Sequence, residues 1–138
     1  MKSRQVVYVG VDVSKETLSV DADRLFKGDL PNNEKGFRKL IGTLRKAVPC
    51  GTLHVVFEST GPYGSRLFSA LCREGVSASQ LNPAKVRHFA RAMSQTAKTD
   101  PIDARVIRLF AEAKRPEPDR VPSEGECGIR QLVLARNA

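Results

Sequence analysis

The chain has 138 residues, of which 41% are hydrophobic, and this length and composition suit one globular domain with its own core. No apolar run approaches the roughly 20 residues that a membrane-spanning helix requires, and no signal-peptide segment is evident, so we expect a cytoplasmic protein. The three cysteines lie far apart, which is typical neither of a disulfide framework nor of a zinc site. The net charge of +8 indicates an acidic polymer as partner, most often nucleic acid, with an anionic membrane as the lesser option.

The first part of the chain predicts a three-stranded antiparallel meander. Residues 6–13 are β-branched and almost continuously apolar, as in a strand that is buried on both faces. Asp12 interrupts this run, and a charge in a buried strand needs a partner or a metal, unless Asp12 simply caps the turn at Ser14. Residues 17–20 and 24–30 are shorter strand candidates.

The next part of the chain predicts alternating helices and strands. Residues 34–47 have an apolar stripe with helical spacing, and either Asn32 or Asn33 can cap this helix. A second apolar strand, residues 53–58, again ends on an acid, Glu58. The elements expected after it are a helix over residues 62–74 capped by Ser59 or Thr60, a strand over 76–81, a helix from Pro83, a loop over 92–99 and a helix over 101–114.

Two acids, Asp100 and Asp103, lie three residues apart at the expected start of the last helix. Pro101 suits the first helical position and Asp100 the N-cap before it, so both carboxylates would lie near one face of the first turn. Helix capping and the macrodipole also explain both acids without any further function. The residues that this helix is expected to bury are Ile102, Val106, Leu109, Phe110 and Ala113.

Basic residues are concentrated around this acidic pair. Between residues 85 and 115, eight basic residues stand against three acidic ones. Phosphate contacts are predicted for Lys15, Lys85, Arg87, His88, Arg91, Lys98, Arg105 and Arg108. A solvated helix face that is basic by chance is the alternative. The other histidine, His54, stands alone on its strand and is interpreted as a strand residue rather than a ligand.

The order of the elements indicates an α/β sandwich with a mixed five-stranded sheet and helices on its faces. Asp12 and Glu58 end two strands, and open sheets of this kind form their sites beyond the carboxyl ends of strands. If these strands are parallel neighbours, Asp100 and Asp103 can close a four-carboxylate site. Repulsion of about 4 kcal/mol per close pair at intermediate dielectric predicts divalent cations there, two Mg²⁺ ions with Mn²⁺ as a substitute.

Four motifs in the chain resemble those of DEDD insertion-sequence transposases, the bridge-RNA-guided DNA recombinases. They are G-V-D-V-S-K at residues 10–15, F-E-S-T-G-P-Y at 57–63, L-N-P-A-K-V-R-H-F-A at 81–90 and K-T-D-P-I-D-A at 98–104. The resemblance is to the N-terminal domain of the family and implies an RNase H-like fold similar to that of RuvC resolvases. It implies a Mg²⁺-binding tetrad of Asp12, Glu58, Asp100 and Asp103. It also implies a guide RNA, double-stranded DNA, dimers or tetramers, and a place at the prokaryotic nucleoid.

The domain organisation expected from this resemblance is a metal-binding domain over residues 1–115 and a Pro-rich linker leading into a helix over 116–138. In the family, the catalytic serine lies in a C-terminal domain beyond such a linker. Ser59 and Ser65 lie near Glu58, but nothing marks either of them as this nucleophile. We therefore expect the chain alone to bind metal and nucleic acid without completing recombination.

Two other function classes fit parts of the pattern. An ATPase of the sugar-kinase or actin type also begins with a strand-borne Asp, but its phosphate turn wants a glycine where this chain has Val13, Ser14 and Lys15. A non-catalytic basic module that binds nucleic acid needs no acidic tetrad. Replacing Asp12 and Asp103 by Asn distinguishes that module from a metal-dependent enzyme, because metal affinity is lost only in the enzyme.

Overall fold

A computed structural model of the chain describes residues 6–48, 52–59, 61–93 and 103–119. The strands are β1 (Val6–Val13), β2 (Thr17–Asp21), β3 (Lys27–Pro31), β4 (Thr52–Ser59) and β5 (Ser77–Gln80). The helices are α1 (Glu34–Ala47), the 3₁₀ turn η1 (Gly61–Gly64), α2 (Ser65–Arg73), α3 (Pro83–Ala92) and α4 (Ala104–Lys114). Together they form an RNase H-like α/β fold, which confirms the predicted class.

The five strands form one mixed sheet in the order β3-β2-β1-β4-β5. β1 pairs antiparallel with β2, and β2 with β3, as the predicted meander requires. β1 pairs parallel with β4, and β4 with β5, through helical crossovers. β3 begins at Lys27 rather than at residue 24, because the preceding residues close a turn in which the Ala22 N–H donates to the Phe26 carbonyl and Asp23 has a φ of 60°.

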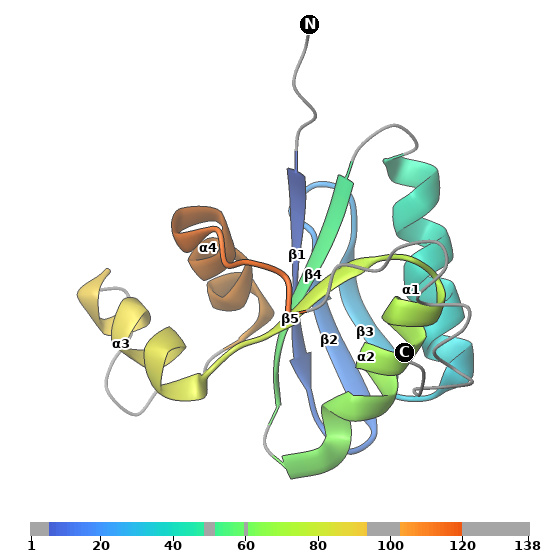
Figure 1. Ribbon diagram of the computed structural model, residues 1–138, viewed down its shortest axis with the longest axis horizontal. Helices are drawn as coiled ribbons and strands as arrows, with labels where there is room; N and C mark the ends of the chain where they lie inside the picture. The colour runs from blue at the N-terminus through green and yellow to red at the C-terminus, as the bar shows by residue number, and fades with distance from the viewer. Residues whose placement is uncertain (1–5, 49–51, 60, 94–102, 120–138) are drawn as a thin grey trace, which may run out of the picture.

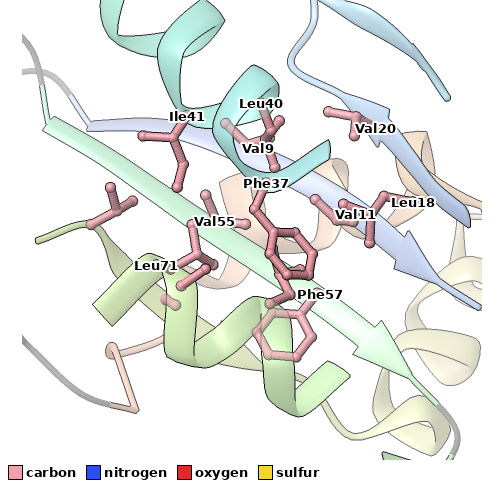
Figure 2. Close-up of a cluster of buried hydrophobic side chains, with 14 of the residues drawn as sticks. Val9, Val11, Leu18, Val20, Phe37, Leu40, Ile41, Val55, Phe57 and Leu71 are labelled. Atoms are coloured by element: carbon pink, nitrogen blue, oxygen red, sulfur yellow. The ribbon is translucent and has the colours of Figure 1, made fainter. Parts of the chain in front are cut away.

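Helices cover both faces of the sheet, with α1 and α2 on one side and α3 and α4 on the other (Figure 1). The larger core cluster lies under α1 and α2. Figure 2 shows Val9, Val11 and Val55 of the two central strands packed against Phe37 of α1 and Leu71 of α2. A smaller cluster joins Val56 to α3 and α4 on the opposite face. Two clusters form because successive side chains along each strand point to opposite faces of the sheet.

The first helix forms where its capping signals predict, and the second begins later. Asn33 caps α1 by accepting a hydrogen bond from the Gly36 N–H. α2 starts at Ser65 with Gly64 at its N-cap, because the Ser65 hydroxyl donates to the Pro62 carbonyl and closes a 3₁₀ turn first. The predicted cap at Ser59 is wrong, since Ser59 ends β4, and Thr60 lies outside the described residues.

Helix α4 also begins later than predicted. It starts at Ala104, and Asp103 is its N-cap, with an extended backbone and a carboxylate that accepts from the Val106 N–H at 3.0 Å. The predicted start at Pro101 with Asp103 in the first helical turn is therefore wrong, while Asp100 and Pro101 lie outside the described residues.

The buried face of α4 differs from the predicted one as well. Ile107 and Ala111 are buried, whereas Leu109 is only partly buried and Ala113 is exposed. This difference follows from the close contact of α4 with β1, because the side of α4 that carries Ala104 faces this strand.

This contact is unusually close at Gly10 of β1. A Cβ at this position would lie 2.6 Å from the Arg108 nitrogen and closer still to the Ala104 carbonyl oxygen. Both are backbone atoms of α4, so neither can move aside as a side chain would. Any other residue at position 10 would push α4 away from the sheet.

The segment after α4 stays on the sheet. The Asp119 N–H donates to the Ala78 carbonyl at 3.0 Å, and the Asp119 carboxylate accepts from the Gln80 N–H at 2.7 Å. The Ser79 hydroxyl donates to the Glu117 carbonyl at 3.0 Å. Residues 117–119 thus run along the free edge of β5, while residues 120–138 of the predicted linker and helix lie outside the described residues.

Replacement of Gly10 by Ala tests the contact with α4. We expect Gly10→Ala to lower the free energy of unfolding by about 1–3 kcal/mol, the usual cost of overpacking a filled interior. Gly42→Ala is the matched control, because Gly42 lies within α1 and nothing lies near its added Cβ. That variant should gain about 0.5–1 kcal/mol from helix propensity. Urea denaturation followed by circular dichroism measures both, and a Gly10→Ala variant as stable as the parent would contradict the packing argument.

Candidate functional site

Two acids meet where β1 and β4 end side by side. In the parallel register Asp12 is paired with Glu58, one residue before the last residue of each strand. Their strand neighbours Val11 and Phe57 belong to the core under α1 and α2. Because successive side chains alternate between faces, Asp12 and Glu58 both point to the face covered by α4. Both carboxylates are half-buried.

Helix α4 brings a third acid to this place. Its first turn rests on Gly10, two residues before Asp12, so the N-cap Asp103 lies near the carboxyl end of β1. Burial, followed by repulsion from Glu58 and from Asp103, raises the pKa of Asp12 from an ordinary 3.8 to about 6. Three of the four predicted acids therefore share one electrostatic environment. The fourth, Asp100, lies outside the described residues.

The chemistry of these groups suits a hard divalent cation. Carboxylate oxygens are the ligands that Mg²⁺ prefers, and a cation would relieve the repulsion that raises the pKa of Asp12. Among the residues that the structure describes, Asp103 accepts a hydrogen bond through its Oδ1 alone, which leaves Oδ2 for a ligand. Within the described ranges, no three acidic, histidine or cysteine side chains lie close enough to hold a metal ion by themselves. The acids fit as part of a metal site that needs a further ligand.

Asn32 supports the two loops that follow Asp12 and Glu58. Its Nδ2 donates to the Ser14 carbonyl at 2.9 Å and to the Tyr63 carbonyl at 3.1 Å. Its Oδ1 is buried and has no hydrogen-bond partner in the part of the chain that the structure describes. The sequence offered Asn32 only as an alternative cap for α1, and nothing local distinguished it from Asn33.

Most of the predicted phosphate-binding residues are exposed. They are Lys15 in the turn after β1, Lys85, Arg87, His88 and Arg91 on α3, and Arg105 on α4, whereas Lys98 lies outside the described residues. A groove of about 850 Å³ lies between residues of α3 and α4, and Lys85, His88 and Lys114 line it together with Phe89 and Phe110, whose rings meet edge to face.

Arg108 has a different role from the one predicted. Its side chain is 8% exposed, its Nε donates to Asp21 Oδ1 at 2.7 Å, and its Nη1 donates to Glu112 at 2.9 Å. With its donors directed at these carboxylates, Arg108 is not a phosphate contact, and we correct that assignment. It joins α4 to β2 instead, which helps to hold the helix that Asp103 caps.

His54 is a buried strand residue, as predicted. Its Nε2 lies 2.7 Å from the Ser79 hydroxyl, which donates in turn to the Glu117 carbonyl. Burial lowers the pKa of His54, and the nearby Asp119 and Glu117 oppose this shift in part. His54 therefore helps to hold residues 117–119 on β5 and is not part of the acidic site.

Comparison with known proteins shows which family the chain resembles. The family model of DEDD transposases of the IS110 type, described as a transposase, matches residues 9–138. Pilin gene-inverting proteins from Moraxella bovis and Moraxella lacunata are each 24% identical to the chain over 133 residues. These alignments cover 94% of the chain and 41% of each relative, so the chain spans about two-fifths of their length. No helix in the described ranges is long and apolar enough to cross a membrane.

The raised pKa of Asp12 predicts how the stability of the chain depends on pH. Because this pKa is higher in the folded chain than in the unfolded one, ionisation of Asp12 opposes folding. The contribution of Asp12 to the free energy of unfolding should thus fall as pH rises from 3.8 to about 6. In metal-free buffer, Asp12→Asn should be more stable than the parent above pH 6, with the difference vanishing toward pH 3.8.

Urea denaturation at several pH values measures this difference. Glu16→Gln is the control, because it removes one exposed carboxylate from the same end of the sheet. A pH-independent difference between Asp12→Asn and the parent would contradict the raised pKa.

Replacements of Arg108 and of Arg105 should differ in their effect on stability, because Arg108 is buried in an ion pair and Arg105 is exposed. Arg108→Ala leaves Asp21 buried and unpaired, so we expect it to lower the free energy of unfolding by about 3–5 kcal/mol. Arg105→Ala removes an exposed side chain and should stay within about 0.5 kcal/mol of the parent. Denaturation curves of the two variants test this, and equal losses would refute the assigned roles.

Proposed function

Because the chain belongs to the DEDD transposase family of the IS110 type, we propose that it forms the N-terminal part of a DNA recombinase, with a metal-dependent site for strand cleavage and transfer. The observation that carries this proposal is the register that pairs Asp12 with Glu58, beside which α4 sets Asp103. Transposition and inversion of DNA both require that phosphodiester bonds be broken and rejoined.

In this proposal Asp12, Glu58, Asp100 and Asp103 hold two Mg²⁺ ions, with Mn²⁺ as a substitute. Such ions stabilise the charge that develops on attacking and leaving oxygens of a phosphodiester. Asp12 must be ionised to act as a ligand, so its pKa of about 6 makes metal affinity fall as pH drops toward and below 6. The α4 backbone keeps Asp103 in position through the cap and the contact at Gly10.

The basic side chains of the same side of the sheet would hold the nucleic acid. Lys15 is exposed three residues after Asp12, and Arg105 is exposed two residues after Asp103, so both belong to the segments that carry the acids. The α3 residues Lys85, Arg87, His88 and Arg91 extend the positive surface away from them, and Lys98, which lies outside the described residues, is also predicted to contact phosphate. We propose double-stranded DNA as the substrate and, from the family resemblance, a guide RNA and assembly into dimers or tetramers at the nucleoid in the prokaryotic cytoplasm.

The chain alone should not complete the recombination reaction. The relatives it matches are more than twice as long, and the family resemblance implies a serine nucleophile in the remaining part. We propose that the 138 residues bind Mg²⁺ and DNA but need that part for recombination.

Calorimetric titration with Mg²⁺ at pH 7.5 tests the metal site. Asp12→Asn, Glu58→Gln and Asp103→Asn should each weaken binding by at least about tenfold, in line with the loss of one ligand from a shared site. Asp103→Asn is informative because Asn caps helices as well as Asp does, so α4 should be retained. Glu16→Gln serves as the control for net charge. Unchanged Mg²⁺ affinity in all three variants would favour a non-catalytic nucleic-acid module.

A further inference from the structure

Helix α1 carries a second basic surface. Its buried residues Phe37, Leu40, Ile41 and Leu44 face the sheet. The opposite side presents a stripe of exposed basic residues at helical spacing, which we call the α1 stripe: Lys35, Arg38, Lys39, Arg45 and Lys46.

The acids near the α1 stripe do not neutralise it. Glu34 is the only acid of α1, and it already accepts from Arg73 of α2 at 3.0 Å. Arg45 is paired with Glu74 at 3.4 Å. Among the residues that the structure describes, no carboxylate forms an ion pair with the other four members of the stripe.

This arrangement costs stability within the helix. Lys35 and Lys39 are like charges four residues apart, a spacing that destabilises a helix by about 0.2–0.5 kcal/mol. Gly42 lies in the middle of the stripe, where it lowers helix propensity and where nothing lies near its missing Cβ. A helix face that serves only solubility would carry mixed charges and a better helix former. A polyanionic ligand accounts for the lack of compensating acids, and an unobstructed Gly42 lets that ligand approach the helix.

The α1 stripe faces away from the acidic site. Val9 and Val11 of β1 point into the core under α1, whereas Gly10 contacts α4. The sheet therefore separates α1 from α4 (Figure 1). A straight duplex that contacts the acids beside α4 cannot also lie along α1.

We propose that the α1 stripe binds the phosphate backbone of a second double-stranded nucleic acid, distinct from the one at the acidic site. The 11 residue steps from Lys35 to Lys46 span roughly 16 Å of helix. None of the exposed positions of α1 is aromatic, whereas surfaces that bind single strands use aromatic rings for stacking. Phosphate contacts alone suit a duplex, whose bases are already stacked. This binding needs no metal, so it is independent of the proposed cleavage site.

Charge reversal on α1 tests the proposal. We expect Lys35→Glu with Lys39→Glu to reduce the slope of log affinity for a DNA duplex against log salt by about 2, as for two lost phosphate contacts. The control is Arg24→Glu with Lys27→Glu, which changes net charge equally at exposed positions outside α1. Circular dichroism checks the fold of both. An equal reduction in the two double variants would overturn the proposal.

The number of bound duplexes distinguishes a second site from an extension of the first. In EDTA, calorimetry should find two duplexes per parent chain, and reversal of Lys35 and Lys39 should weaken one of the two binding events while reversal of Lys85 and Arg87 weakens the other. One duplex on the parent chain, or stronger binding of single-stranded than of duplex probes, would overturn the proposal. Mg²⁺ affinity should be unaffected by reversal at Lys35 and Lys39, so failure here and failure of the metal site are separate results. Duplex RNA and duplex DNA, tested in parallel, show which backbone the stripe prefers.

Discussion

The parallel pairing of β1 with β4 determines both the core and the acidic site. In this register Val11 lies beside Phe57 and Asp12 beside Glu58, so one face of each strand fills the core and the other presents a carboxylate. A shift of one residue would reverse the face of every β4 side chain. Phe57 would then point toward α4, and Glu58 would be directed into the apolar cluster. Burial of Phe57 therefore also keeps Glu58 in position.

The second determinant is the contact of α4 with Gly10. It lets the helix backbone approach β1 closely enough to set Asp103 beside Asp12, and the buried pair of Arg108 with Asp21 holds the same helix to β2. Stability and site geometry are consequently coupled in α4. A mutation that loosens this helix is expected to change the electrostatic environment of Asp12 without altering any of the acids.

The sequence allowed prediction of features that depend on neighbouring residues or on a regular period. These features include β1, α1 and the acids at the ends of β1 and β4, because alternation and capping signals are local. The start of α4 was missed because Asp100 with Pro101 and Asp103 both satisfy the capping rules, and the contact with Gly10, far along the chain, cannot be read locally.

Arg108 was misassigned for a similar reason. Its partner Asp21 is 87 residues away, and a basic residue among other basic residues suggests a surface. The role of Asn32 depends on two loops that only the fold brings together. Asp100 and the complete four-acid site stay predictions.

The segment that leaves α4 also affects how copies of the chain would behave toward each other. Strand edges expose unpaired N–H and C=O groups, and these can pair with another chain. At one edge of the sheet, Asp119 forms hydrogen bonds with the Ala78 carbonyl and the Gln80 N–H of β5. At the other edge, β3 is short and presents the charged Lys27 and Asp29. A fragment cut after residue 115 would keep every helix and strand that the structure describes, yet it would uncover β5 and promote edge-to-edge aggregation.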